Sequence, residues 1–315
     1  MGAWFYIILA VIAALLLFGV LPVLVMSFII YSVLLIRNKP DKWGRVCSFP
    51  DDPEYKRMFD TGIEWGEKYK DKKSPVEVKS GRFRLAGEYF DFGGDKAVII
   101  ISGRTEGCLY SYYFAEPYRK SGYNVLVIDN RAHGLSEGKI NSLGYREYKD
   151  IIAWSELLKA KGNNTVVLHG ICIGASTALF AATAKKCPEH IKAIVTEGMY
   201  VNFYESLKNH FTEKNKPIVP MAWGVVVHLF FISGANVVTD GPIKRIAYMK
   251  KPILMLQSRE DTYSMPELAQ KLYDKCPSAD KKLVYFPKGA HSRIRINDEE
   301  AYDRTIEEFL AEKGL

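Results

Sequence analysis

The residues best suited to covalent chemistry lie in the pentapeptide Gly170-Ile-Cys-Ile-Gly174. A short apolar run, Val166–Leu168, precedes this motif and a helix-forming stretch follows it, as a sharp strand-to-helix turn requires. Such a turn exposes its middle residue, and glycines on both sides avoid collisions across it. Cys172 would also point at a helix N-terminus, whose partial positive charge favours the thiolate. The pattern therefore predicts that Cys172 is a nucleophile.

A nucleophile needs a base, and the base needs an acid that orients it. Asp261 and His291 each lie five residues after the end of an expected strand. Both side chains thus follow the carboxyl ends of consecutive strands, where sites in open α/β sheets gather. The chain order nucleophile, acid, histidine predicts a triad of Cys172, Asp261 and His291, with Glu260 as an alternative acid.

Backbone N–H groups near the nucleophile must stabilise the negative charge that develops on the substrate oxygen. One donor is expected from Ile173, the residue that follows Cys172. The second is expected from the loop Ser102-Gly-Arg-Thr105, at either Arg104 or Thr105. These donors would form an oxyanion hole.

The elements that must position these residues are short apolar runs rich in Val, Ile and Leu. Strands that are buried on both faces of a sheet have this composition. An antiparallel pair around a turn at Gly81 comes first, and six further runs follow it. The expected strands are Val76–Val78, Leu85–Phe92, Ala97–Ile101, Val125–Ile128, Val166–Leu168, Ala193–Val195, Ile253–Leu256 and Leu283–Phe286.

Helical stretches separate most of these strands. The expected helices are Tyr145–Lys161, Ala175–Lys186, Leu268–Lys275 and Asp298–Glu312. Strand–helix alternation of this kind predicts the α/β class, with a mostly parallel eight-stranded sheet and helices on both faces. We expect this domain to occupy residues 75–315, after a linker and amphipathic lead-in at residues 37–74.

The stretch between the expected strands at 193–195 and 253–256 contains no clear strand. We therefore expect a cap insertion at about residues 199–249. Its apolar run, Met221–Ser233, has 13 residues and is too short to span a bilayer unaided. We favour a cap over the active site for this run, with a peripheral membrane contact or an ordinary buried helix as the alternatives.

The first 36 residues contain no charged side chain, and about 20 apolar residues suffice to cross a bilayer. They lack the basic n-region and cleavage site of a secretory signal, so we expect a retained transmembrane anchor. Gly19 and Pro22 leave two layouts open, one long kinked helix or a hairpin of two short helices. Four basic residues follow within residues 37–45, so the positive-inside rule predicts a cytoplasmic catalytic domain.

The overall composition argues against several classes of protein. The net charge of +7 comes from 43 basic and 36 acidic residues that are spread along the chain, so nucleic-acid binding is not expected. The five cysteines are widely spaced and form no C-x-x-C pair, which predicts neither a disulfide framework nor a zinc site. The sequence also lacks glycine-rich phosphate loops and clustered metal ligands, so no cofactor and no metal are expected.

These motifs resemble the α/β-hydrolase superfamily, and more narrowly its bacterial membrane-anchored, serine aminopeptidase-like group. Asp129-Asn-Arg-Ala-His-Gly-Leu-Ser-Glu-Gly138 is similar to the D-x-R-G-H-G-x-S-x-G signature of the family, and Leu143–Asp150 to the helix that follows it. The resemblance covers about residues 59–310 and implies the α/β-hydrolase fold, with a structural role for the loop that holds His133. Cys172 stands where most relatives carry serine, which looks like dienelactone hydrolases and polyhydroxyalkanoate synthases.

The cysteine determines which reaction is expected. A thiolate paired with an imidazolium attacks activated acyl groups readily, whereas amides have a poor leaving group. We therefore expect hydrolysis of an ester or thioester, in which Cys172 attacks, His291 transfers the proton and Asp261 orients His291. The alternatives are acyl transfer from the same acyl-cysteine and a catalytically silent binding protein. The anchor and the apolar insertion favour a small-molecule or lipid-derived acyl substrate at the membrane surface.

Overall fold

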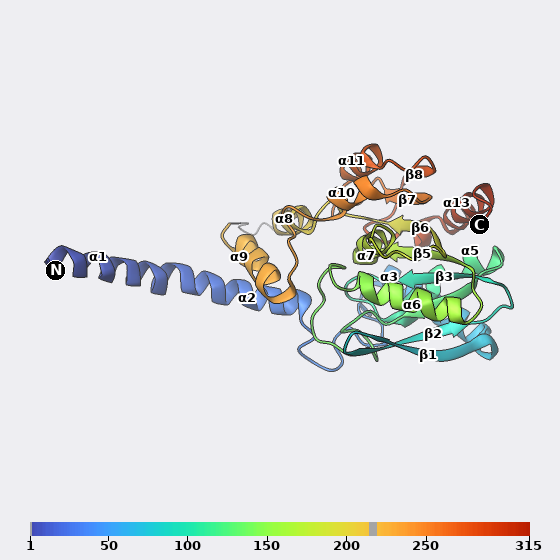
Figure 1. Cartoon of the computed structure of the whole chain (residues 1–315), viewed down its shortest axis with the longest axis horizontal. Coiled ribbons are helices and arrows are strands. Elements are labelled where there is room, and N and C mark those ends of the chain that lie inside the picture. The colour runs from blue at the N-terminus through green and yellow to red at the C-terminus, as the bar shows by residue number, and fades with distance from the viewer. Residues whose placement is uncertain (1, 214–218) are drawn as a thin grey trace.

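The computed structural model describes residues 2–213 and 219–315. A long N-terminal helix projects from a layered α/β domain, and the C-terminus lies at the far end of that domain (Figure 1). In the described part of the chain, eight strands form one sheet in the order β1-β2-β4-β3-β5-β6-β7-β8. The strands are β1 Lys73–Ser80, β2 Phe83–Phe90, β3 Lys96–Ile101, β4 Asn124–Ile128, β5 Thr165–Ile171, β6 Ile191–Glu197, β7 Ile253–Ser258 and β8 Lys281–Phe286.

The sheet is mostly parallel, as the sequence predicts. β2 pairs antiparallel with β1 and β4, and the remaining neighbours pair parallel. The expected strands are close to the observed ones, although several of the expected ranges are shorter than the observed strands. β5, for example, continues beyond its apolar run because His169 and Gly170 still pair with Val195 and Thr196 of β6. This extension carries the strand up to the predicted nucleophile.

Helices cover both faces of the sheet. The α-helices of the described residues are α1 Ala3–Ala14, α2 Leu21–Leu35, α3 Pro53–Lys68, α4 Cys108–Ser111, α5 Glu116–Lys120, α6 Tyr148–Ala160, α7 Ile173–Ala182, α8 Phe203–Glu213, α9 Met221–His228, α10 Pro242–Arg245, α11 Pro266–Lys275, α12 Ile294–Asn297 and α13 Glu299–Glu312. Alternate residues of one strand point to opposite faces. Leu168 therefore belongs to one hydrophobic cluster with Trp154 of α6, whereas its neighbour Val167 belongs to another with Met58 of α3 and Phe309 of α13.

The N-terminal segment is one continuous helix, Ala3–Leu35, of 33 residues. Among the described residues, it is the one helix that is both long and apolar enough to cross a membrane. Of the two layouts that the sequence leaves open, the structure therefore has the single helix. A π-helical segment, Leu15–Val20, lies just before Pro22. Because proline has no N–H to donate, such local widening of the helix is a common response to it.

The segment between the anchor and the sheet packs closely against the domain. Ile36 forms a β-bridge with Ile140, and the N–H of Gly134 donates to the carbonyl oxygen of Trp43 at 2.8 Å. The amphipathic lead-in forms α3, whose buried residues include Met58. The segment expected as a linker thus holds the N-terminal helix against the domain over many residues.

The insertion at residues 199–249 contains α8, α9 and α10 and, in its described part, no strand. Phe203 and Leu207 of α8 line a pocket at the top of the sheet. The apolar run Met221–Ser233 has a different position. It forms α9 and a π-helical continuation, Leu229–Ser233, which lie alongside α2 (Figure 1).

Candidate active site

Cys172 lies at a sharp turn between β5 and α7. Its backbone has φ 56° and ψ −114°, a conformation that non-glycine residues rarely adopt and that costs about 1–3 kcal/mol. Two hydrogen bonds hold the turn. The N–H of Cys172 donates to the carbonyl oxygen of Glu197 at 2.9 Å, and the N–H of Ala175 donates to the carbonyl oxygen of Cys172 at 3.1 Å. The surrounding structure thus holds the cysteine in a strained position above the sheet.

The two glycines of the pentapeptide are required by close packing. A Cβ atom on Gly170 would overlap the carbonyl group of Gly174. A Cβ atom on Gly174 would overlap the carbonyl group of Ile101 at the end of β3. Backbone atoms cannot move aside as a flexible side chain can. The spacing of the motif therefore reflects how tightly the turn packs against the neighbouring strand.

Asp261 and His291 lie in hydrogen-bonding contact although they are 30 residues apart. His291 Nδ1 is 2.8 Å from Asp261 Oδ2. The other carboxylate oxygen of Asp261 accepts the N–H groups of Tyr263 at 2.8 Å and Ser264 at 2.7 Å. These bonds fix the carboxylate, so the carboxylate in turn fixes the orientation of the ring. Glu260, the alternative acid, instead accepts the N–H of Gly289 at 3.0 Å.

The imidazole of His291 and the thiol of Cys172 line the same pocket. Burial lowers the pKa of His291, but the charge of Cys172, and then that of Asp261, outweigh it and raise the pKa well above its ordinary value. The Nε2 atom is buried and makes no hydrogen bond of normal geometry to the described residues. Such contacts are often loose before substrate binds. The arrangement favours the imidazolium form of His291.

The predicted oxyanion donors also line this pocket. Ile173 follows the nucleophile, and Arg104 lies in the loop after β3. The N–H of Thr105, by contrast, donates to Glu106 Oε2 at 3.2 Å, and its hydroxyl donates to Oε1 at 2.6 Å. In this conformation the N–H of Thr105 is occupied. Of the two alternatives in the loop, Arg104 is therefore the better placed donor.

The loop after β4 and the segment before α3 both hold the loop after β3 in place. His133 Nε2 lies 2.7 Å from the carbonyl oxygen of Arg104, and Ser48 Oγ donates to the carbonyl oxygen of Thr105 at 2.8 Å. The ring of His133 stacks on Trp43, with centroids 4.7 Å apart. Burial lowers the pKa of His133, and the hydrogen bonds to the carbonyl oxygens of Arg104 and Arg131, the latter 3.0 Å from Nδ1, oppose this effect. This contact agrees with the structural role that the resemblance implies for His133.

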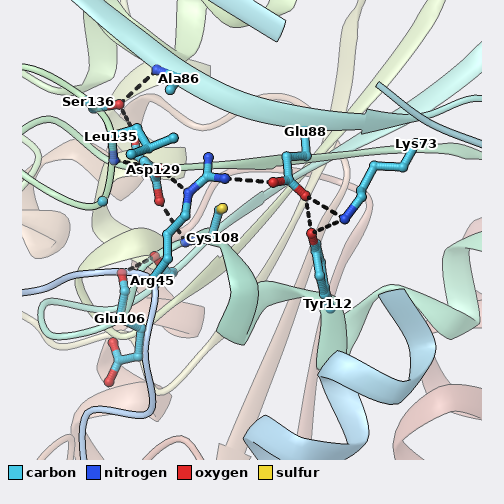
Figure 2. Close-up of polar contacts among 12 residues, drawn as sticks. Arg45, Lys73, Ala86, Glu88, Glu106, Cys108, Tyr112, Asp129, Leu135 and Ser136 are labelled. Atoms are coloured by element: carbon cyan, nitrogen blue, oxygen red, sulfur yellow. Dashed lines mark hydrogen bonds and ion pairs between the residues drawn. The ribbon is translucent and has the colours of Figure 1, made fainter. Parts of the chain in front are cut away.

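A buried ionic network anchors the same region (Figure 2). Arg45 lies between two carboxylates, with Nη1 2.6 Å from Glu88 Oε1 and Nε 2.8 Å from Asp129 Oδ2. Asp129 also accepts the N–H groups of Cys108 and Leu135, each at 2.9 Å. The network therefore ties the segment after the anchor to the loops that follow β3 and β4.

A second buried network lies beneath the turn at Cys172. Tyr302 donates to Glu197 Oε2 at 2.7 Å and lies 3.2 Å from His169 Nε2. Desolvation raises the pKa of Glu197 from 4.5 to about 7 and outweighs the hydrogen bond from Tyr302. Desolvation lowers the pKa of His169 to about 3, so this ring is neutral. The backbone of Glu197 supports the nucleophile while its carboxyl group forms part of a largely uncharged core.

The pocket itself has a volume of about 210 Å³. Phe203 and Leu207 of α8 form part of its wall, and Leu34 of α2 forms another part. Pockets that enclose a drug-sized ligand usually measure about 300–1,000 Å³. The pocket is thus large enough for an acyl group and a few carbons, and it has a partly apolar lining.

With this geometry established, comparison with known proteins is informative. A family model described as the alpha/beta hydrolase fold matches residues 96–223. An esterase of Pyrococcus furiosus of known structure superimposes with a TM-score of 0.66 and 23% identity, covering 78% of this chain and 93% of that chain. The chain has the α/β-hydrolase fold.

Two sequence relatives extend the comparison. The uncharacterized protein YqkD of Bacillus subtilis is 29% identical over 222 residues, which are 68% of this chain and 70% of that protein. An uncharacterized membrane protein of Saccharomyces cerevisiae is 25% identical over 199 residues, which are 63% of this chain and 64% of that protein. The matched region therefore spans less than two thirds of the yeast protein.

Within this α/β-hydrolase fold, the structure brings Cys172, His291, Ile173 and Arg104 to one pocket and holds Asp261 behind His291. Sequence reasoning missed three groups of contributing residues: Glu106 in the loop after β3, Leu34 of the anchor, and the buried pair Glu197 and Tyr302. Glu106 follows Thr105 directly and could have been considered with it. The others reach the site through tertiary packing, for which a single sequence carries no local signal.

Proposed function

We propose that the chain is a membrane-anchored hydrolase of esters or thioesters that acts through Cys172, His291 and Asp261. The observation that carries this proposal is the 2.8 Å contact between His291 and Asp261 in the pocket that also contains the strained Cys172. The proposed hydrolase activity is also supported by the fold, which the chain shares with the Pyrococcus esterase. The raised pKa of His291 supports the choice of a thiolate–imidazolium pair.

In the first half of the reaction, the thiolate of Cys172 attacks the carbonyl carbon of the substrate. The N–H groups of Ile173 and Arg104 stabilise the oxyanion that forms. The tetrahedral intermediate then collapses, the bond to the alcohol or thiol breaks, and the leaving group takes a proton from His291. The product of this half is an acyl-cysteine thioester with a neutral imidazole next to it.

In the second half, neutral His291 removes a proton from a water molecule, and the resulting hydroxide attacks the thioester carbon. Collapse of this second intermediate breaks the bond between carbon and sulfur. The acid leaves and the thiolate–imidazolium pair is restored. Asp261 stabilises the imidazolium throughout, as the orienting acid does in related triads.

We also propose that Ala3–Leu35 anchors the chain in a membrane with the catalytic domain on the cytoplasmic side. The length and apolar character of this helix support anchoring, and so does the similarity to a yeast membrane protein. The basic residues after the helix support the orientation. A reporter fused after Leu315 should be accessible only from the cytoplasm, and accessibility only from outside would contradict the orientation.

One observation favours a different function, that of a catalytically silent binding protein. The carboxylate of Glu106 occupies the N–H of Thr105 and lies next to Gly103, close to where an oxyanion would form. A negative charge at this position opposes the charge of the intermediate. A silent protein would show neither turnover nor an acyl adduct with any acyl substrate.

The deciding experiment uses the purified full-length protein with acyl thioesters and p-nitrophenyl esters. We expect turnover, and we expect an acyl adduct on Cys172 in intact-mass analysis. Cys172→Ala and His291→Ala should abolish turnover, whereas Cys187→Ala, which alters a partly exposed free cysteine outside the pocket, should preserve it. Loss in only one of the first two variants would argue against the triad.

Two narrower questions are answered by the same assays. If an added alcohol or thiol intercepts the acyl-cysteine faster than water does, the protein is an acyltransferase and not a hydrolase. The resemblance to the serine aminopeptidase-like group leads to a second comparison, with aminoacyl amides as substrates. We expect the amides to react much more slowly than the esters because their leaving group is poor.

A further inference from the structure

The apolar run Met221–Ser233 packs against the domain-proximal half of the anchor (Figure 1). Gly224 lies so close to Ser27 that a Cβ atom on this glycine would overlap the serine side chain. The polar groups of the two helices pair with each other. Ser27 Oγ lies 3.2 Å from His228 Nε2, and Tyr31 Oη lies 2.8 Å from Ser233 Oγ. Small residues in close contact and paired polar groups are typical of helix association inside membranes.

The opposite face of this run is apolar and exposed. The run contains no Asp, Glu, Lys or Arg side chain. Its outward residues retain large exposed fractions: Trp223 45%, Val227 39%, Phe230 53% and Phe231 78%. Neighbouring residues of α2, including Phe28 and Ile29, are exposed as well. Soluble proteins rarely leave a contiguous apolar surface of this extent in water.

The contacts with the anchor place the run at a definite depth. The anchor has 33 residues and is about 50 Å long at 1.5 Å per residue, longer than the hydrocarbon core of about 30 Å. Lys42 Nζ donates to the carbonyl oxygen of Val33 at 2.8 Å and so places a positive charge at the end of α2. If this charge marks the interface, Ser27 and Tyr31 lie within the adjacent leaflet. The run, about 20 Å long, would then be embedded beside them.

From these contacts we infer that Met221–Ser233 is embedded in the lipid leaflet beside the anchor, and that the catalytic pocket receives an acyl chain from this leaflet. The second part rests on the proposed hydrolase function. One apolar cluster joins Tyr31 and Leu35 of the anchor, Val225 and Leu229 of the run, and Ile173 next to the nucleophile. Cys172 packs against the same cluster. An acyl chain could therefore pass from lipid to the nucleophile along apolar side chains.

The pocket supports the same direction of entry. Its wall includes Leu34 of the anchor and Phe203 and Leu207 of α8, so the anchor and the insertion both border it. Its volume of about 210 Å³ is too small for a complete membrane lipid. The rest of a long-chain substrate would have to remain outside the pocket. The hydrocarbon of the leaflet is a favourable environment for an acyl chain, because it keeps the apolar surface of the chain out of water.

The membrane placement can be tested without any activity. Full-length protein is reconstituted in vesicles of phosphatidylcholine and phosphatidylglycerol, and a membrane-impermeant maleimide is added to Phe231→Cys or Tyr248→Cys. Tyr248 is 64% exposed on the catalytic domain and is the matched control. Relative to wild type, Tyr248→Cys should be labelled at least about tenfold faster than Phe231→Cys, because hydrocarbon excludes the charged reagent and disfavours a thiolate. In SDS both should be labelled equally.

Two results would overturn the membrane placement. The first is labelling of Phe231→Cys in vesicles as fast as that of Tyr248→Cys. The second is protection of Phe231→Cys that is lost when the protein is diluted with lipid. That result would show that a second copy of the chain, and not lipid, covers Phe231. Protection that is independent of the ratio of protein to lipid supports the leaflet.

The route of entry is tested separately with Phe231→Lys. Hydrolysis of a long-chain acyl thioester carried in vesicles should fall about tenfold, because a charge inside the leaflet is costly. Hydrolysis of p-nitrophenyl acetate in water should remain unchanged, since Phe231 does not line the pocket. An equal loss on both substrates, or no loss on either, would contradict entry from the leaflet. If the wild type hydrolyses neither substrate, the proposed function and the route of entry fail together, while the labelling result still decides the placement.

Discussion

Replacing Glu197 by glutamine should remove most of one pH-dependent contribution to folding stability. This carboxyl group is fully buried at the end of β6, where it accepts hydrogen bonds from Tyr302 and from the N–H of Ile294. Desolvation outweighs these bonds and raises its pKa from 4.5 to about 7. The folded protein therefore binds a proton in a pH range where the unfolded chain has released it.

The sign and size of the effect follow from this difference. Because the folded-state pKa is the higher one, the stabilisation is complete below pH 4.5 and is lost as the pH rises through about 7. A difference of one pKa unit corresponds to about 1.4 kcal/mol. The rise from 4.5 to about 7 therefore contributes about 3 kcal/mol to the free energy of unfolding. About 2.5 kcal/mol of this contribution is lost between about pH 5 and about pH 8. Glutamine resembles the protonated acid in shape and is neutral at every pH.

The measurement is urea unfolding of the full chain in mild detergent, followed by tryptophan fluorescence, at about pH 5 and about pH 8. We expect the free energy of unfolding of the wild type to fall by about 2.5 kcal/mol more than that of Glu197→Gln. The raised pKa of His291 gives a loss in the same direction in both proteins. Because the charge of His291 also lowers the pKa of Glu197, the difference reports the carboxyl group together with its coupling to His291. Glu64→Gln, at an exposed position of α3, serves as the control and should behave like the wild type.

An equal pH dependence in Glu197→Gln and the wild type would refute the argument that burial controls this carboxyl group. A further check uses Tyr302→Phe, which removes a hydrogen bond that lowers the pKa of Glu197. In this variant the loss of stability should begin at a higher pH than in the wild type. A shift toward lower pH would show that the phenol does not stabilise the carboxylate.

Three other substitutions test the packing around the site. Gly174→Ala should lower the free energy of unfolding by about 3 kcal/mol, because its Cβ atom would overlap the backbone of Ile101. Gly19→Ala, at a position with open space around it, is the control and should leave the free energy of unfolding unchanged. Thermal unfolding of the two variants is the measurement. Arg45→Met leaves the fully buried Asp129 without its ionic partner and should cost about 3–5 kcal/mol in urea unfolding, so a neutral effect would show that the network is dispensable. Ser48→Ala removes the hydrogen bond to the carbonyl oxygen of Thr105. We expect kcat for an ester to fall about tenfold at nearly constant KM. An unchanged kcat would mean that the loop after β3 does not need this hydrogen bond.

The sheet and the proximity of Cys172, Asp261 and His291 were predictable because their signals are local. Each buried strand is an apolar run, and the pentapeptide around Cys172 lies between such a run and a helix. Asp261 and His291 follow the ends of two neighbouring strands, and parallel strands bring such ends to one edge. Residue spacing therefore carried enough information to place these three side chains near one another.

The contacts between distant segments were not predictable in this way. His133 supports Arg104 and stacks on Trp43, but nothing in the sequence around Trp43 indicates such a partner. The apolar run Met221–Ser233 is equally consistent with a cap, a core helix or a membrane contact when only its composition is known. Its position was decided by pairing with Ser27 and Tyr31, about 200 residues away in the chain. Tertiary packing of this kind leaves no periodic pattern in the sequence.

Leu34 belongs both to the anchor and to the wall of the pocket. A protease that cut the chain just after this residue would leave Cys172, Asp261 and His291 in place but would remove one side of the pocket. Cleavage before Val33 would leave that side of the pocket on the cut domain. If the proposed function holds, the loss of the N-terminal helix would therefore end the activity or preserve it, depending on a difference of a few residues in the position of the cut.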